Sequence, residues 1–258
     1  MSSLIYTPRY FGPNAFPIPE INSGKIDDEY KLEMRFDFHK ATGDNTRNLY
    51  TKMYLPFGRK AAIEASWIIR EFYHTSEAIK AERHAYNMQP ANGNACVGDV
   101  VINVYYQLIE SEKWLDILFS FGLKTASGNM LVDARYTDAA NYWFDMNFGK
   151  NLFQTKEKDI YLRLVAKMGF YCYMTNSMVH RQNDALMGGG GLKIRLKNLY
   201  ADADFRGFSG YWNNGDSPFL FRTELKYRLK NHSFFINYSE GLYDWIFTTY
   251  SAGYGIHF

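Results

Sequence analysis

The sequence predicts an all-β protein, a transmembrane antiparallel up-and-down β-barrel of 12 strands. Three observations lead to this prediction. Apolar and polar residues alternate over twelve short segments, and the connections between these segments are long and short in turn. No apolar run in the 258 residues approaches the roughly 20 that a membrane-spanning helix needs, whereas strands of a membrane barrel need only about 9–11.

The first segment shows the period of two most clearly. Leu32, Met34 and Phe36 alternate with Glu33 and Arg35. Because successive side chains of a strand point to opposite faces, one face is apolar and the other is charged. The same pattern recurs over residues 30–38, 50–57, 63–70, 99–108, 116–124, 142–148, 160–171, 192–197, 199–206, 221–229, 234–239 and 250–258.

Each segment has its own apolar face of aliphatic and aromatic side chains. The twelve apolar faces include, one residue per segment in chain order, Phe36, Leu55, Trp67, Val104, Phe119, Phe144, Leu164, Ile194, Phe205, Leu225, Ile236 and Tyr254. Charged residues at the apolar parity occur at segment ends, at Lys40, Glu71 and Lys150, where lipid headgroups could solvate them. A soluble barrel would instead have an apolar interior and a polar exterior.

The connections fall into two sets. The longest, at residues 75–97, 126–140 and 175–184, follow the third, fifth and seventh segments, whereas the intervening connections include the tight turns at 58–60, 198 and 230–232. Long loops at one end and short turns at the other are typical of outer-membrane barrels.

The chain ends in a strand with aromatic and aliphatic residues at alternating positions: Tyr250, Tyr254, Ile256 and the terminal Phe258. This pattern resembles the C-terminal signature of Gram-negative outer-membrane β-barrel proteins, which the barrel-assembly machinery reads. The resemblance implies a bacterial outer-membrane location, with the signal peptide already removed from this chain. It also implies outer-membrane lipid and the assembly machinery as partners.

A second resemblance covers about thirty residues. The sequence VGDV at 97–100 opens one segment, and KTASG at 124–128 closes the next. These motifs resemble the glycine–aspartate strand and the lysine-to-glycine strand end of outer-membrane channels associated with aromatic-degradation pathways, which are more distantly similar to fatty-acid transporters. That family usually has a proline in the second motif, where this chain has Ala126 and Ser127. The resemblance implies a monomeric twelve-stranded channel for small molecules.

Charged residues on the polar faces are the candidate lumen and selectivity residues. They are Lys124, Arg163, Lys167, Lys193, Arg195, Lys197, Asp202, Asp204, Arg206, Arg222, Glu224, Lys226 and Arg228. Their excess of positive charge could form a basic ring that selects anions. Alternatively, the acidic members could pair with the basic ones across strands in a structural ladder.

The first 28 residues do not follow the strand pattern. They contain Pro8, Pro13, Pro17 and Pro19, and such a segment cannot join a central sheet. We expect residues 1–28 to form either a plug inside the barrel, as in proteins similar to fatty-acid transporters, or a flexible periplasmic tail. Residues 29–258 form the barrel, and both termini are expected on the periplasmic side.

The function predicted from these features is an outer-membrane channel for passive uptake of small solutes, either anionic or amphipathic and hydrophobic. One alternative is an accessory or structural barrel that binds a lipoprotein or another subunit through the loop at 75–97. Another is a barrel enzyme, a lipid hydrolase or a protease, but no His–Ser pair at a strand rim indicates one. We expect no catalytic residues, no metal and no cofactor, because a solute gradient drives passive transport.

Two further expectations concern composition and local sequence. The formal net charge of +2 gives no indication of nucleic-acid binding. Cys96 and Cys172 are expected to be two free thiols, although both lie at the long-loop end and a disulfide is allowed. The four glycines at 188–191 suggest a bulge, a bend or a close approach of another segment.

Overall fold

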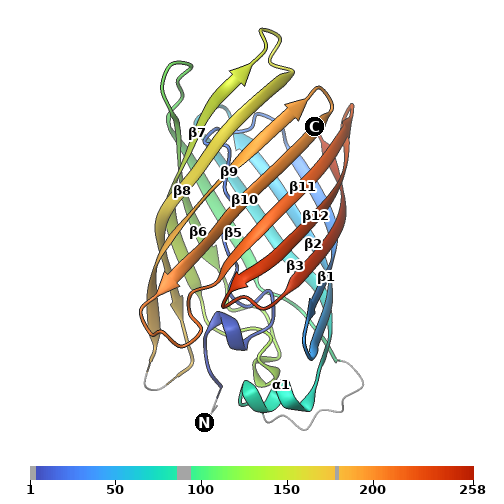
Figure 1. The fold of residues 1–258 in the computed structure, drawn as a ribbon, viewed down its shortest axis with the longest axis vertical. Helices are drawn as coiled ribbons and strands as arrows, with labels where there is room; N and C mark the ends of the chain where they lie inside the picture. Colours follow the sequence, from blue (N-terminus) through green and yellow to red (C-terminus); the bar gives the residue numbers. More distant parts are fainter. Residues whose placement is uncertain (1–3, 86–93, 178–179) are drawn as a thin grey trace.

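The computed structural model describes residues 4–85, 94–177 and 180–258, and within them the chain forms one closed β-barrel (Figure 1). The elements are η1 (Pro8–Tyr10), β1 (Lys31–Ala41), β2 (Asp44–Phe57), β3 (Ala61–Thr75), α1 (Glu77–Glu82), β4 (Asn94–Cys96), β5 (Val100–Ile109), β6 (Asp116–Lys124), η2 (Leu131–Asp133), β7 (Asn141–Gln154), β8 (Ile160–Met174), β9 (Gln182–Leu196), β10 (Leu199–Gly210), β11 (Phe219–Leu229), β12 (His232–Tyr243) and β13 (Thr248–His257).

Twelve of these strands make the barrel wall. Each pairs antiparallel with its neighbours in the chain, and β1 pairs with β13 from Lys31↔His257 to Lys40↔Thr248, which closes the sheet. β4 is not part of the wall, because it adds three residues to the loop end of β3. The predicted twelve-stranded antiparallel barrel is confirmed.

Several strands reach further toward the long loops than the alternation predicts. β9 begins at Gln182, ten residues before the predicted segment, and β2 begins at Asp44 rather than at residue 50. The alternation was too weak to show these extensions. In β9 the glycines at 188–191 interrupt it, yet the pairing with β8 and β10 continues without a register shift.

A β-bulge overturns one expectation from the strand pattern. The register of β2 and β3 shifts between Leu49 and Tyr50, and an extra residue in one strand moves the following side chains to the other face. Glu71, expected on the apolar face among headgroups, is therefore inside the barrel and fully buried, whereas Arg70 is exposed.

The two faces of the wall differ as the alternation predicts. On β1, Leu32, Met34 and Phe36 are 41–58% exposed on the outside, whereas Glu33 and Asp37 are buried inside. Large apolar side chains are similarly exposed on the other strands. Polar groups inside and apolar groups outside are the reverse of a soluble barrel and are suited to a lipid environment.

Residues 4–28 run through the inside of the barrel (Figure 1). Near the long loops, Gly12 N donates to Ala134 O. Further along, Asn22 N donates to Asn147 Oδ1 at 2.9 Å, and at the short-turn end Ile26 N donates to Gln107 Oε1 at 2.7 Å. The start of β1 and the end of β13 lie together at the turn end. The N-terminal end of the described chain lies at the long-loop end, opposite the C-terminus (Figure 1).

The long-loop end carries the short helices. α1 lies there, with Ser76 Oγ capping its first turn by accepting from Ile79 N. Among the residues that the structure describes, no helix is long and apolar enough to cross a membrane.

Candidate functional site: the barrel lumen

The lumen has three layers along the barrel axis. At the long-loop end, residues 4–16 pack against the wall and the loops. In the middle, a cavity of about 190 Å³ lies between residues 13–22 and the wall. At the turn end, a strongly charged vestibule of about 420 Å³ follows, and Glu20, Arg35 and Arg222 line both spaces.

Aromatic side chains pack together at the loop end. Phe11 and Phe16 are buried and lie edge to face at 5.5 Å between ring centroids, and Phe16 meets Tyr173 at 4.8 Å. Tyr171 and Phe208 stack at 4.3 Å. We call this set the seal; its members are Leu4, Tyr6, Phe11, Phe16, Trp143, Tyr171, Tyr173 and Phe208.

A buried ionic cluster borders the seal. The Arg135 guanidinium lies 2.9 Å from Asp44 Oδ2 and 2.8 Å from Glu71 Oε1. Burial opposes the charged form of Arg135, but Asp44 and Glu71 outweigh it and hold the pKa of this guanidinium above its usual range. Asn14 Nδ2 donates to Glu71 Oε2 at 2.7 Å, and Arg83 reaches Asp44 at 2.7 Å. The cluster thus joins residue 14, the loop after β3 and the loop after β6.

The two motifs that carried the channel resemblance meet in space. Lys124 Nζ lies 2.7 Å from Asp99 Oδ2, and Gly128 N donates to Asp99 Oδ1 at 2.6 Å. Gly98 O accepts from Trp67 Nε1 at 3.0 Å. Lys124 is fully buried, so this predicted lumen residue is part of a closed ion pair at the loop end.

Most of the other predicted lumen residues face carboxylates on the same strand or on another element. The pairs are Arg163–Asp116 (2.5 Å), Lys167–Asp145 (3.2 Å), Lys193–Asp202 (2.6 Å), Arg206–Asp204 (3.6 Å), Arg222–Glu224 (2.5 Å), Lys226–Glu33 (3.0 Å) and Arg228–Glu29 (2.7 Å). These contacts favour the structural ladder over a ring of unpaired cations.

Two predicted lumen residues lie away from this ladder. Arg195 packs its guanidinium 5.1 Å from the Tyr200 ring centroid and donates from Nε to Lys197 O. Lys197 is in the β9–β10 turn with a φ of 58°. Both are therefore at the mouth of the turn end.

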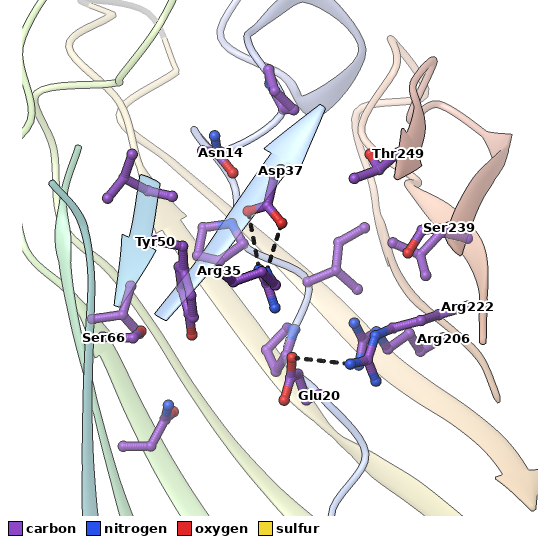
Figure 2. A pocket seen from close by; sticks show the side chains of 18 of the residues that line it. Asn14, Glu20, Arg35, Asp37, Tyr50, Ser66, Arg206, Arg222, Ser239 and Thr249 are labelled. Carbon is purple, nitrogen blue, oxygen red and sulfur yellow. Dashed lines mark hydrogen bonds and ion pairs between the residues drawn. The ribbon is translucent and has the colours of Figure 1, made fainter. Parts of the chain in front are cut away.

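The middle cavity is lined by polar and apolar groups from the wall and from the N-terminal segment (Figure 2). Arg35 pairs with Asp37 at 2.6 Å, and Glu20, from the N-terminal segment, lies 4.0 Å from Arg222 and 3.3 Å from Lys52. Prolines from residues 13–19 of the N-terminal segment also line this cavity.

Sequence reasoning missed several residues of this lumen. Trp143 and Tyr171 were assigned to the polar faces of their segments, and large aromatic residues at that parity are the signal of an internal packing partner. Asn14 and Glu20 carry no such signal, because their positions depend on the path of an irregular segment. Glu71 was hidden by the bulge.

The terminal signature lies on the outer face of β13. Tyr250 is 56% exposed and Phe258 71% exposed, and Phe258 N donates to Tyr30 O at 3.0 Å. Recognition of Tyr250, Tyr254, Ile256 and Phe258 by an assembly machinery stays a prediction. Cys96 and Cys172 are both free, as expected, and both are buried.

A closed barrel with a polar interior and an apolar exterior defines the class: this chain is a membrane-spanning β-barrel of the outer-membrane type. No family model matches the sequence, and no curated protein matches it.

Solved structures with this fold include outer-membrane channels and the transport unit of the autotransporter AIDA-I from Escherichia coli (TM-score 0.52, 8% identity, 98% of this chain and 99% of that chain covered). The chain is similar to the NanC porin (TM-score 0.59, 11% identity, 87% of this chain and 98% of that chain covered). It is also similar to the COG4313 outer membrane channel from Pseudomonas putida F1 (TM-score 0.57, 9% identity, 95% of this chain and 98% of that chain covered). A third similar structure is the KdgM porin in complex with disordered oligogalacturonate (TM-score 0.55, 11% identity, 88% of this chain and 99% of that chain covered). At these identities the likeness establishes the fold.

Proposed function

We propose that this protein is a bacterial outer-membrane channel for passive uptake of small solutes. The observation that carries the proposal is the polar lumen inside an apolar wall, with a charged vestibule that continues into the middle cavity. Three of the solved barrels of similar fold are channels, and one of these, the KdgM porin, was obtained in complex with disordered oligogalacturonate. An anionic solute is consistent with the guanidinium groups of the lumen.

We further propose that residues 1–28 act as a plug rather than as a tail. Residues 4–16 contribute Phe11 and Phe16 to the seal, and burial of such a side chain stabilises the closed state by about 1.5–3 kcal/mol each. Asn14 adds a hydrogen bond to buried Glu71. Opening toward the long loops then requires this segment to leave or to rearrange.

The test is planar-bilayer conductance of the detergent-refolded chain, compared with a variant that lacks residues 2–24. We expect low conductance from the full chain and at least a several-fold rise in the variant. Unchanged conductance would contradict the proposal that residues 1–28 are a plug. An absence of conductance in both folded proteins would contradict the proposed channel function. Circular dichroism of both proteins verifies that the barrel is folded.

We infer that the barrel is a channel rather than an enzyme. His39 is the histidine that lines the middle cavity, and its two ring nitrogens lie 2.7 Å from Thr249 Oγ1 and 2.8 Å from Asn48 Oδ1. Both nitrogens are thus engaged in a buried network, which supports a structural role for this side chain. A hydrolase assay on the refolded protein, with His39→Gln as the control, tests this inference.

We also propose that residues 75–85, the first part of the loop at 75–97, fold over the barrel and that this loop is not a docking site for a lipoprotein. Arg83 is 2% exposed and pairs with Asp44 of the β1–β2 hairpin, which folds this part of the loop inward. Residues 86–93 lie outside the described part of the chain. Co-purification of a stoichiometric partner from native membranes would favour the accessory role.

A further inference from the structure

The middle cavity contains a buried guanidinium whose donors are unused. Arg206, on β10, is 7% exposed and lines this cavity. Its Nε and Nη1 atoms are buried and make no hydrogen bond within the described parts of the chain. Asp204 Oδ1 lies 3.6 Å from Nε, beyond hydrogen-bond distance. Because an unsatisfied buried donor is costly, this group is suited to a ligand that accepts hydrogen bonds.

The other cationic side chains around the cavity differ from Arg206. Arg35 has Asp37 at 2.6 Å, Lys167 has Asp145 at 3.2 Å, and Arg222 has Glu224 at 2.5 Å. Each of these charges is already compensated at close range. Arg206 therefore stands out among them as the cation with capacity for an added anion.

The wall beside Arg206 leaves room for the guanidinium. Gly189 faces inward on β9, opposite Arg206 in the register, and a Cβ atom there would lie 2.9 Å from the Cα and Cβ atoms of Arg206. Gly191 has the same relation to Asp204, at 2.9 Å from its Cα atom. Side chains at these two glycines would displace the pair from the wall.

The other residues that line the cavity indicate the size and polarity of the part of the ligand that does not contact Arg206. Hydroxyl groups come from Ser239 and Thr249 (Figure 2) and from Ser251. The apolar surface comes from tryptophans and prolines, among them Trp143, Trp245 and Pro17. The volume of about 190 Å³ is below the roughly 300–1,000 Å³ of sites for drug-sized molecules. The ligand is therefore small, with a body that is more apolar than polar.

Acidic groups in the same lining limit its charge. Glu20, Asp37 and Glu64 also face the cavity, and a second carboxylate on the ligand would be repelled by them in a space of low dielectric constant. The lining therefore favours one negative charge rather than two.

We propose that this cavity binds a small monocarboxylate with a compact, largely apolar body. The carboxylate accepts hydrogen bonds from the Arg206 guanidinium, and the body packs against the tryptophans and prolines. The ligand enters from the vestibule, which shares Glu20 and Arg222 with the cavity. As a statement about the transported solute, this inference rests on the proposed channel function; as a binding site it stands independently of it.

The test is an equilibrium titration of the detergent-refolded full chain with benzoate, followed by tryptophan fluorescence. Two of the five tryptophans, Trp143 and Trp245, are buried in the lining of the cavity and report on its occupancy. Benzamide has nearly the same shape without the charge. We expect saturable binding of benzoate and at least about tenfold weaker binding of benzamide, the loss typical of a missing charged hydrogen bond.

Variants at Arg206 assign the effect to one side chain. Arg206→Gln is expected to weaken benzoate binding by about tenfold or more, and Arg206→Lys by less, because an ammonium keeps the charge but not the planar fork. The matched control is Arg47→Gln, an exposed arginine on the outer face of β2, which should leave the affinity unchanged.

Three results would overturn the site: equal affinities for benzoate and benzamide, unchanged benzoate affinity in folded Arg206→Gln, or no saturable binding. If Arg206→Gln fails to fold, the benzoate–benzamide comparison in the unmodified chain decides. The conductance test is separate. If the chain binds benzoate through Arg206 but does not conduct, the binding site is supported and the channel function is contradicted. If the chain conducts but does not discriminate between benzoate and benzamide, only the binding site is contradicted.

Discussion

Two lysine–aspartate pairs at opposite ends of the lumen have nearly the same geometry. Lys124 and Asp99 are 2.7 Å apart at the loop end, and Lys193 and Asp202 are 2.6 Å apart at the turn end. Their surroundings differ, because the side chains of the first pair are 0% and 2% exposed and those of the second are 19% and 21% exposed.

The difference extends to other pairs at the two ends, such as Arg135 with Asp44 (both 0% exposed) at the loop end and Arg228 with Glu29 (27% and 32% exposed) at the turn end. In the buried loop-end pairs, loss of one partner leaves an uncompensated buried charge. In the partly exposed turn-end pairs, water can replace a lost partner. The same chemistry therefore acts as a closure at one end and as an adjustable electrostatic surface at the other.

The largest effect is expected from Phe11→Ala in the seal. Phe11 is fully buried between Tyr6 and Phe16, each with its ring centroid 5.5 Å away. Removing its ring should destabilise the closed lumen by roughly 3–5 kcal/mol. Protease cleavage within residues 4–28 and the midpoint of urea unfolding measure this loss. Phe205→Ala, on the outer face, is the control, and an equal effect there would contradict a specific role of the seal.

The two lysine–aspartate pairs allow a direct comparison. Asp99→Asn should lower the free energy of unfolding by about 3–5 kcal/mol, because Lys124 is left charged and buried. Asp202→Asn should lower it by less than about 1 kcal/mol. Combining Lys124→Met with Asp99→Asn should restore much of the loss. Equal losses at the two ends would show that burial does not distinguish them.

A smaller effect is expected where the wall approaches Arg206. Gly189→Ala introduces a methyl group against the backbone and Cβ atom of Arg206 and should cost about 1–3 kcal/mol in unfolding free energy. Gly188→Ala is a matched control on the outer face, since its Cβ atom would lie 3.5 Å from the nearest atom, an ordinary contact. If both variants have the same unfolding midpoint, the close approach at Gly189 does not restrict the size of the side chain at this position.

The smallest effect on stability is expected at the vestibule. Arg228 and Glu29 are paired at 2.7 Å with side chains 27% and 32% exposed, so Arg228→Gln should change the unfolding free energy by less than about 1 kcal/mol. In a channel that conducts, it should instead shift the reversal potential under a salt gradient toward cations, and high salt should reduce the shift. A large loss of stability without a change in selectivity would reverse the contrast between the two ends.

The sequence predicted the barrel well because a strand has a fixed period. Leu32 and Glu33 had to face opposite ways, and twelve repetitions of that pattern leave few alternatives for the fold. The same reasoning failed at Glu71, because one extra residue in β3 reverses the parity and nothing in the local sequence marks the bulge. It also underestimated the length of β9, because glycines have no side chain to show which face of a strand they lie on.

The lumen could be predicted in composition but not in arrangement. The charged residues of β8 to β11 were identified, yet whether Arg222 or Arg206 would be paired depends on which carboxylates of neighbouring strands come within reach. The contribution of Glu20 and Phe16 depends on a proline-rich segment whose path has no periodicity.

The amino-acid sequence by itself determined the strand number, the lipid-facing side of the wall and the long-loop end, because each follows from local alternation and from connection length. The tertiary structure decided which buried charges are compensated and that residues 4–28 pass through the barrel. These depend on contacts between residues far apart in the chain, such as Asn14 with Glu71 and Lys124 with Asp99, and their geometry exists only after the barrel has closed.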